Sequence, residues 1–211
     1  MTTTPRHIAC FCETTFDAEI PSSADVAADP EIEQLILDGN FMAVTCPACG
    51  KRLTPEFPFR LTGVKGLGEI LMVPEVDRAA YVRGALEYVT GSPTRVVVGF
   101  PELAEKVLAA GAGRDDRVIE MMKYYLLTGS EPSEGGESPQ EVRILYRGVE
   151  RGRHVFAIMG LREGEVGMAR LADDLYVRIA ADVEARVKEE PFADFCSPPW
   201  VSLRRLTGAG A

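Results

Sequence analysis

The sequence predicts an α+β protein, and three features of its 211 residues lead to this class. Short β-branched or alternating runs and amphipathic helical segments follow one another along the chain, which is typical of mixed secondary structure. Two close cysteine pairs, Cys10 with Cys12 and Cys46 with Cys49, occur near the N-terminus. An acidic stretch rich in Gly, Ser and Pro at 129–140 sets off the last part of the chain as a separate region.

The first elements are expected around the cysteine pairs. Residues 6–20 are predicted to form a strand that carries the first pair, and the breakers at 21–23 are predicted to end it. A helix is expected at 29–38, because Asp29 can cap it and Gly39 follows its last turn.

The middle of the chain is expected to alternate strands and helices. A strand at 41–46 delivers the second cysteine pair, and the prolines in the return strand at 52–61 indicate an edge or irregular strand. The β-branched run at 94–100 is expected to be a buried strand, because it lies between turn signals. The remaining elements expected here are a strand at 68–76 and helices at 77–91, 101–111 and 115–129.

Composition divides the chain into three parts. Residues 1–128 are expected to form a cysteine-bearing module joined to an α/β region, and residues 129–140 a solvated linker without large apolar side chains. Residues 141–211 are expected to form a small α+β region, with a β-hairpin that turns at 150–153 and a helix at 171–190.

Composition and charge exclude several classes of protein. Apolar residues make up 46% of the chain, which is enough for a folded core. The net charge of −9 repels phosphate backbones and anionic lipid headgroups, so neither nucleic acid nor a membrane is expected as a partner. The N-terminus lacks the apolar region of a signal peptide, and no apolar run is long enough to cross a bilayer. The sequence therefore predicts a cytoplasmic protein, whose cysteines are metal ligands or thiols rather than a disulfide framework.

The four paired cysteines indicate a zinc site. Zn²⁺ prefers four tetrahedral ligands, and two close thiolate pairs brought together supply them. Cys46 and Cys49 flank two residues, so both can reach one ion, and Gly50 tolerates the positive φ that such a turn needs. Cys10 and Cys12 are one residue apart, so their sulfurs point to the same face of a strand. The N-terminal module is therefore predicted to be zinc-ribbon-like, with a structural ion whose coordination sphere is full.

Other interpretations of these cysteines stay open. An iron–sulfur cluster also accepts four thiolates, although the spacing of the pairs is more typical of zinc ribbons. Cys46 and Cys49 have the spacing of a thioredoxin-like redox pair, but that motif opens a helix, and a strand is expected here. His7 is an alternative ligand to Cys10.

Evidence for an enzyme is sparse. The two histidines, His7 and His154, belong to no recognisable catalytic motif, and no phosphate-binding loop or dinucleotide fingerprint is present. The fifth cysteine, Cys196, is a candidate nucleophile with His154 as its base, and a buried thiol is the simpler alternative. Asp115 and Asp116 precede a helix, where capping accounts for them. The sequence thus leaves enzymatic activity uncertain and favours its absence.

The N-terminal half of the chain resembles a known family. The stretches "HIACFCETTFDAEI", "DPEIEQLILDG" and "FMAVTCPACGKRL" together resemble the CpXC family of bacterial and archaeal proteins, and so do "TRVVVGFPELAEKV" and "DDRVIEMMKYYLL". The resemblance covers about residues 6–127. The family is named for two Cys-Pro-x-Cys-type motifs, and the first motif here departs from that pattern because Phe11 alone separates its cysteines. The resemblance implies a four-cysteine zinc site and no particular activity.

The function that the sequence favours is a zinc-stabilised binding or adaptor protein, with an unknown protein partner or a second copy of the chain. Residues 1–60 carry four Lys or Arg against nine Asp or Glu, a local net charge of −5, which argues against a nucleic-acid-binding ribbon. Trp200, Val201 and Leu203 in the C-terminal tail are candidate interface anchors, and packing back on the chain itself is the alternative that we favour.

Overall fold

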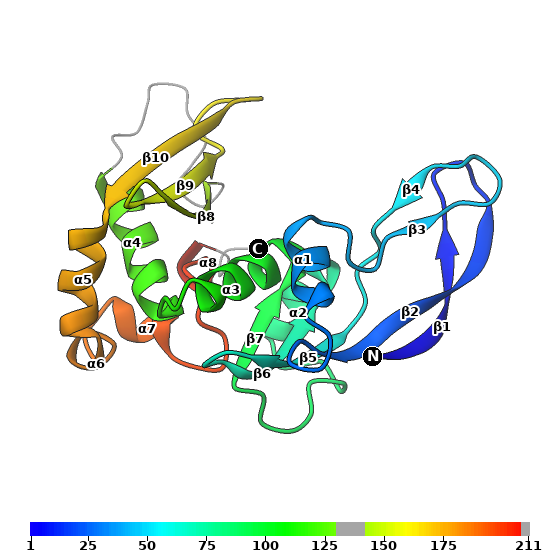
Figure 1. Cartoon of the computed structure of the whole chain (residues 1–211), viewed down its shortest axis with the longest axis horizontal. Helices are drawn as coiled ribbons and strands as arrows, with labels where there is room; N and C mark the ends of the chain where they lie inside the picture. The colour runs from blue at the N-terminus through cyan, green and yellow to red at the C-terminus, as the bar shows by residue number, and fades with distance from the viewer. Residues whose placement is uncertain (130–141, 208–211) are drawn as a thin grey trace. The chain divides into compact units, whose positions relative to one another are not determined.

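The structure is a computed structural model that describes residues 1–129 and 142–207 (Figure 1). The chain divides into two compact units, unit 1 (Met1–Val107) and unit 2 (Leu108–Ala211). Helices and sheets occur in both, which confirms the predicted α+β class. All but the first residue of the predicted linker at 129–140 lies outside the described residues, and the predicted domain boundaries remain predictions.

A five-stranded sheet forms the body of unit 1. Its order is β1-β2-β5-β6-β7, with parallel pairing between β2 and β5 and between β6 and β7. A separate two-stranded sheet joins β3 to β4. The strands are β1 (Thr2–Ala9), β2 (Thr15–Asp25), β3 (Val44–Thr45), β4 (Arg52–Leu53), β5 (Phe59–Val64), β6 (Gly68–Val73) and β7 (Arg95–Val98). The helical segments are α1 (Glu31–Leu37), the 3₁₀ turn η1 (Glu75–Asp77), α2 (Arg78–Val82) and α3 (Gly99–Gly111), the last of which runs past the unit boundary.

The core of unit 1 lies around strands β5, β6 and β7. All four residues of β7 are buried, as the β-branched run predicted, and a strand covered on both faces needs such continuous burial. Phe41, which precedes the second cysteine pair, packs edge-on against Phe59 of β5 with 4.8 Å between ring centroids. The chain that leads into the second pair is therefore anchored on the main core.

The first cysteine pair lies in a turn between two strands, so the predicted single strand over 6–20 is wrong. β1 and β2 form an antiparallel hairpin whose last pair is Ala9 with Thr15. The alternation in 15–20 brings Ile20 onto the same face as Ile8, and both side chains are buried. The breakers at 21–23 do not end the strand, because β2 gains a second partner in β5 from Ser23 onward.

The helices of unit 1 agree with the sequence in part. α1 lies within the predicted range 29–38 and buries Ile32 and Ile36, but its N-cap position is Pro30 and no side chain caps it. The helix predicted at 77–91 is wrong after its first turns. α2 ends at Val82 because Gly84, at φ +66°, takes the left-handed conformation that terminates helices.

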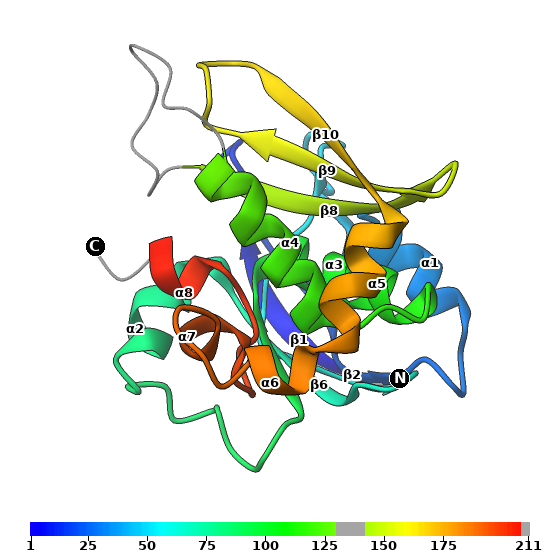
Figure 2. The same ribbon diagram turned by 90° about the vertical axis from the view of Figure 1, so that its left-hand side faces the viewer.

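Unit 2 packs helices against a three-stranded antiparallel sheet of order β10-β9-β8. Its elements are α4 (Asp116–Gly129), β8 (Arg143–Glu150), β9 (Arg153–Met159), β10 (Val166–Ala172), α5 (Asp173–Ala181), α6 (Val183–Arg186), α7 (Phe192–Cys196) and α8 (Arg204–Thr207). Figure 2 shows α4 and α5 on one side of this sheet. The core of unit 2 contains Met121, Met122, Tyr146, Phe156 and Phe195, so α4 contributes its methionines to this core. Asp115 caps α4 by accepting the backbone N–H of Arg117 at 2.9 Å, as predicted.

The C-terminal region contains more structure than the sequence suggested. The hairpin turning at 150–153 is confirmed, but β10 extends it to a third strand. The helix predicted at 171–190 is divided into α5 and α6 at Asp182. Trp200, Val201 and Leu203 are 7%, 0% and 6% exposed, so the alternative in which the tail is buried describes these residues.

Among the residues that the structure describes, no helix is both long and apolar enough to cross a membrane.

Candidate metal centre

The turn between β1 and β2 presents Cys10 and Cys12. Its backbone closes with two hydrogen bonds, from the N–H of Cys10 to the carbonyl of Thr14 and from the N–H of Glu13 to the carbonyl of Cys10, both at 2.9 Å. Glu13 takes φ +66°, a conformation that side chains disfavour, and this lets the chain reverse directly after Cys12. The one-residue spacing is thus accommodated by a tight turn instead of a strand.

The turn between β3 and β4 presents Cys46 and Cys49 in nearly the same way. The N–H of Cys46 donates to the carbonyl of Lys51 at 2.9 Å, and the N–H of Gly50 donates to the carbonyl of Cys46 at 3.0 Å. Gly50 takes φ +72°, as its position after the second cysteine predicted. The two turns therefore share one hydrogen-bonding plan, and the second is longer by one residue.

The shared plan predicts opposite effects of exchanging the residue at positive φ. Glu13→Gly is expected to stabilise unit 1 by about 0.5–1 kcal/mol, and Gly50→Ala to destabilise it by about 1 kcal/mol, because only glycine takes this conformation without strain. No atom lies within 4 Å of a methyl group at Gly50, so the effect there is conformational rather than steric. Urea unfolding, monitored by amide exchange in unit 1, measures both changes in stability. An equal loss of stability in the two variants would contradict the conclusion that the two turns share one plan.

The two turns bring all four sulfur atoms together. The Sγ atoms of Cys10, Cys12, Cys46 and Cys49 all lie within 4.8 Å of one another. Two contacts join sulfurs across the turns, from Cys10 to Cys49 and from Cys12 to Cys46, each at 3.7 Å. A tetrahedral Zn²⁺ with Zn–S bonds of about 2.3 Å holds its sulfurs roughly 3.8 Å apart. The four sulfurs thus have the spacing of a tetrahedral thiolate site, and it is far longer than a disulfide bond.

The four thiols differ in exposure, and Cys10 and Cys12 also differ in pKa. Cys10 and Cys46 are buried, while Cys12 and Cys49 are exposed. Hydrogen bonds from the hydroxyl and then the N–H of Thr14 lower the pKa of Cys12 to about 6. The pKa of Cys10 is about 11, since a backbone hydrogen bond at Cys12 lowers it but burial and the neighbouring thiols together raise it further. A thiolate is therefore favoured at Cys12, and a thiolate is the form that binds metal.

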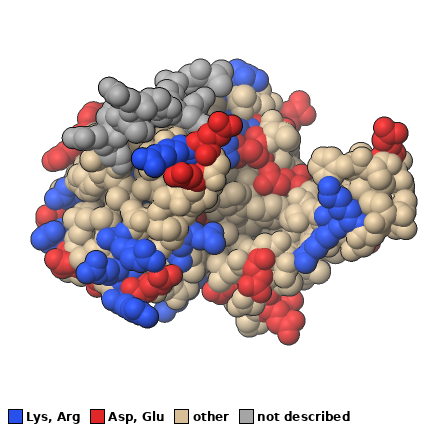
Figure 3. Space-filling view, turned by 90° about the horizontal axis from the view of Figure 1, so that it is seen from above, with Lys and Arg blue, Asp and Glu red and all other residues tan. Residues whose placement is uncertain are grey.

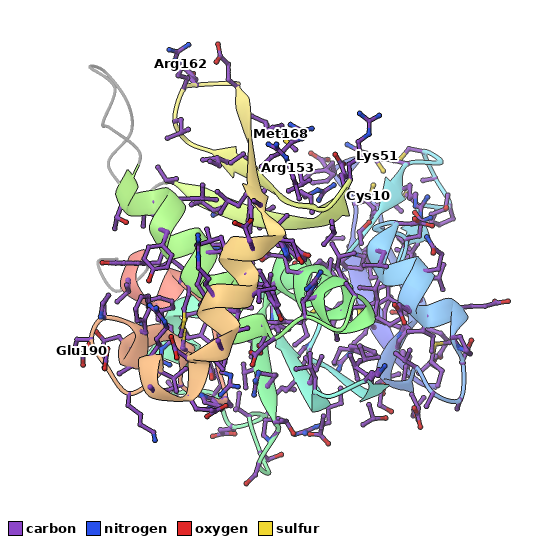
Figure 4. The ribbon with its side chains drawn as sticks, turned by 60° about the vertical axis from the view of Figure 1, so that its left-hand side comes forward. Cys10, Lys51, Arg153, Arg162, Met168 and Glu190 are labelled. Carbon is purple, nitrogen blue, oxygen red and sulfur yellow. The ribbon has the colours of Figure 1, made fainter. Side chains whose placement is uncertain are left out.

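Two side chains that the sequence did not single out lie beside the cluster. Phe11, between Cys10 and Cys12, is 84% exposed, and the Lys51 ammonium lies 4.5 Å from its ring centroid. Figure 4 shows Lys51 and Cys10 at the same end of unit 1. Arg52 donates to the side chain of Asn40. The two cysteine turns thus also present an exposed aromatic ring with a cation over it.

His7 does not belong to this cluster. Its Nδ1 pairs with Asp17 Oδ1 at 2.9 Å across the β1–β2 hairpin, and both side chains are largely exposed. Among the described residues, the cluster of sulfurs contains Cys10 and does not contain His7.

Cys196 and His154 are not arranged as a nucleophile and its base. Cys196 is 1% exposed, belongs to the core of unit 2, and donates to the carbonyl of Arg117 at 3.7 Å. His154 is fully buried, with Nδ1 3.2 Å from the Tyr146 hydroxyl and Nε2 3.0 Å from Asp173 Oδ1. Both ring nitrogens are thus engaged elsewhere, and the thiol fits the alternative of a buried hydrophobe.

A carboxylate cluster at the ends of β6 and β7 was not visible in the sequence pattern. Glu56 accepts the N–H groups of Glu75 at 2.6 Å and Phe100 at 2.8 Å, and Glu102 accepts that of Val98 at 2.9 Å. Arg78 pairs with Glu75 at 2.8 Å and Glu102 at 3.4 Å. These carboxylates satisfy backbone donors where two parallel strands end, which is a structural role.

A mixed α+β fold with four sulfurs at tetrahedral spacing defines a thiolate-rich protein with a candidate metal centre. Residues 8–123 match the family described as CpXC protein, so the chain belongs to the CpXC family, as the sequence motifs predicted. It is also 26% identical over 137 residues to an uncharacterized protein of Treponema pallidum (strain Nichols), across 58% of this chain and 63% of that protein. The chain thus spans less than two thirds of that relative. No solved structure matches the chain significantly.

Proposed function

We propose that the four cysteines bind one structural Zn²⁺, and that this ion keeps folded a module that acts by binding another protein or a second copy of the chain. The observation that carries the proposal is the spacing of the sulfurs, within 4.8 Å overall and 3.7 Å across the turns. When bound, Zn²⁺ supplies four bonds that join two chain segments far apart in sequence.

The donor set supports zinc as the ion and a structural role for it. Four thiolates favour soft or borderline ions and disfavour the oxygen-preferring Mg²⁺ and Ca²⁺. A site with four protein ligands leaves no position for a reacting water. The turns themselves support this role, because each holds its two sulfurs with backbone hydrogen bonds that a single tetrahedral ion can bridge.

Charge supports a protein partner over a nucleic acid. Residues 1–60 carry a net charge of −5 from nine acidic and four basic side chains, whereas a phosphate-binding surface needs a clear excess of Lys and Arg. On the face in Figure 3, Lys and Arg side chains gather at the lower left, with Asp and Glu side chains among them. The exposed ring of Phe11 under Lys51 is the feature near the metal centre best suited to a protein contact.

A thioredoxin-like role for Cys46 and Cys49 has less support. In that motif the first cysteine opens a helix, whose N-terminus stabilises the reactive thiolate. Here the pair is followed by the short strand β4. The zinc proposal also accounts for Cys10 and Cys12, which the redox pair leaves unexplained.

Metal content tests the proposal. Protein purified without added metal is expected to contain one zinc per chain by elemental analysis, and Cys46→Ser/Cys49→Ser is expected to contain none, because two ligands cannot hold the ion. The matched control is Cys196→Ser, which removes a cysteine outside the cluster and is expected to retain the full zinc content. Iron with sulfide, or no metal in the native chain, would overturn the proposal.

A further inference from the structure

We propose that the four sulfurs are also a site of reversible oxidation by hydrogen peroxide, in which Cys12 forms a disulfide with Cys46 and Cys49 forms one with Cys10. This inference rests on the proposed function, since it concerns the regulation of the same centre. It differs from a Cys46–Cys49 redox pair because both disulfides run between the turns rather than within one.

The distances favour pairing across the turns. Four cysteines allow three pairings. The two 3.7 Å contacts belong to one of them, with Cys10 facing Cys49 and Cys12 facing Cys46. A disulfide within the first turn would close a ring over a single intervening residue, and the backbone hydrogen bonds of that turn already restrict its geometry. The pairing across the turns requires only that the tips of the β1–β2 and β3–β4 turns move closer together.

Each of these pairs joins one exposed cysteine to one buried cysteine. Cys12 and Cys49 are exposed, whereas Cys46 is 1% and Cys10 is 6% exposed. Each pair thus combines a sulfur that peroxide can reach with a sulfur that it cannot. This combination suits reversible thiol oxidation, because an accessible thiolate reacts first and a neighbouring thiol resolves the product before it oxidises further. In the remaining pairing between the turns, both exposed sulfurs would join each other.

The chemistry balances with peroxide as the only oxidant. The exposed thiolate attacks one peroxide oxygen, the O–O bond breaks, and a sulfenic acid and water form after protonation. The buried partner then attacks the sulfenic sulfur, the S–O bond breaks, and a second water leaves as the S–S bond forms. Each disulfide therefore consumes one peroxide and gives up two electrons from sulfur. Two disulfides consume all four thiolates that would hold the ion.

The pairing decides what happens to the chain around the centre. Disulfides across the turns keep the β1–β2 turn tied to the β3–β4 turn after the metal ligands are lost. Disulfides within each turn would leave no bond through sulfur between the two turns. The oxidised protein is therefore expected to remain compact in unit 1 and to recover its metal when a dithiol reductant restores the thiolates.

Peptide mapping of the oxidised native protein tests the inference. Metal-loaded protein is treated with peroxide while a chromophoric chelator records released zinc, and the chain is then cleaved after glutamate without reduction. Cleavage at Glu13, Glu33 and Glu56 separates the cysteines into the peptides 1–13 and 34–56. The expected result is loss of one zinc per chain and a species that joins both peptides through two disulfides. Fragment ions between the cysteines are expected to assign Cys10 to Cys49 and Cys12 to Cys46.

The outcomes distinguish this inference from the zinc proposal. Cys196→Ser is the matched control and is expected to give the same zinc release and the same linked peptides, since Cys196 is buried in unit 2. Zinc that stays bound in peroxide, a disulfide confined to peptide 34–56, or irreversible sulfinic acid would overturn the inference and leave the zinc proposal intact. A native chain that contains no zinc before oxidation would overturn the zinc proposal itself.

Discussion

Chelating the proposed zinc ion is expected to unfold the cysteine arm, which we define as residues 6–17 and 44–53, while unit 2 keeps its fold. β3 and β4 are two residues long, and within the arm only Ile8, Cys10 and Cys46 are buried. Isolated two-stranded elements of this kind are marginal in water. A structural zinc site in a small module contributes about 10 kcal/mol or more of apparent binding free energy, which is then folding free energy.

Hydrogen exchange read by mass spectrometry measures this prediction region by region. After chelation, amides of the arm are expected to exchange at rates close to those of a mobile loop, whereas amides of β8 and β9 keep their protection. The Cys46→Ser/Cys49→Ser variant is expected to show the same pattern without chelator. Unchanged protection in the arm would mean that its hydrogen bonds and packing suffice, and the ion would then have no structural role.

Acidification from pH 7 to about pH 5 is expected to destabilise unit 2 through His154. Burial lowers the pKa of His154 most strongly, and the positive charge of Arg114 adds to this, while the hydrogen bond to Asp173 opposes it. Tyr146 of β8 and Tyr176 of α5 are its other polar neighbours. The lowered pKa means that the folded chain resists a proton that the unfolded chain accepts below about pH 6.5.

The sign of the effect follows from proton linkage. Because the unfolded state binds more protons in this range, the free energy of unfolding rises with pH. The stability is fully present above the ordinary histidine pKa and declines as the pH falls, with a slope of up to about 1.4 kcal/mol per pH unit, until the folded-state pKa is reached. His154 therefore makes the stability of unit 2 sensitive to acid.

Trp200 makes the effect measurable in the full chain. It is the single tryptophan, it lies in unit 2, and it is buried, so its fluorescence reports the unfolding of that unit in urea. His154→Gln keeps a donor and an acceptor but cannot take up a proton, and it is expected to flatten the pH dependence between about pH 6.5 and 5. His7→Gln, an exposed position of unit 1, is the matched control and is expected to leave the slope unchanged. An equal slope in His154→Gln would rule out His154 as the source.

Local pattern predicted those parts of the fold that local chemistry decides. The buried strand β7, the helix α4 and the turn at 150–153 follow from β-branched runs, helical spacing and turn residues. Apolar and polar residues also alternate in 15–20, but this alternation does not show that the cysteines lie in a turn outside the strand. The reason is that Glu13 reverses the chain at positive φ, and a glutamate gives no signal for that conformation.

In the candidate site, too, local sequence pattern predicts some features and not others. The spacing of four cysteines sufficed to predict that their sulfurs meet, because few arrangements use such pairs otherwise. The differences among those sulfurs could not be predicted from spacing. Exposure of Cys12 and Cys49 against burial of Cys10 and Cys46 depends on how two separate turns face each other. The same holds for Lys51 over Phe11, which joins residues from both turns.

The shared hydrogen-bonding plan of the two turns has a consequence for how the length of this region can vary. The segment at 13–45 separates the cysteine pairs, and the entropic cost of closing such a loop rises by only about 0.6 kcal/mol when its length doubles. The spacers inside the turns tolerate much less change, because they set where the sulfurs lie; they differ by only one residue between the two pairs. Natural length variation among relatives is therefore expected mainly around α1, between β2 and β3, rather than inside the turns.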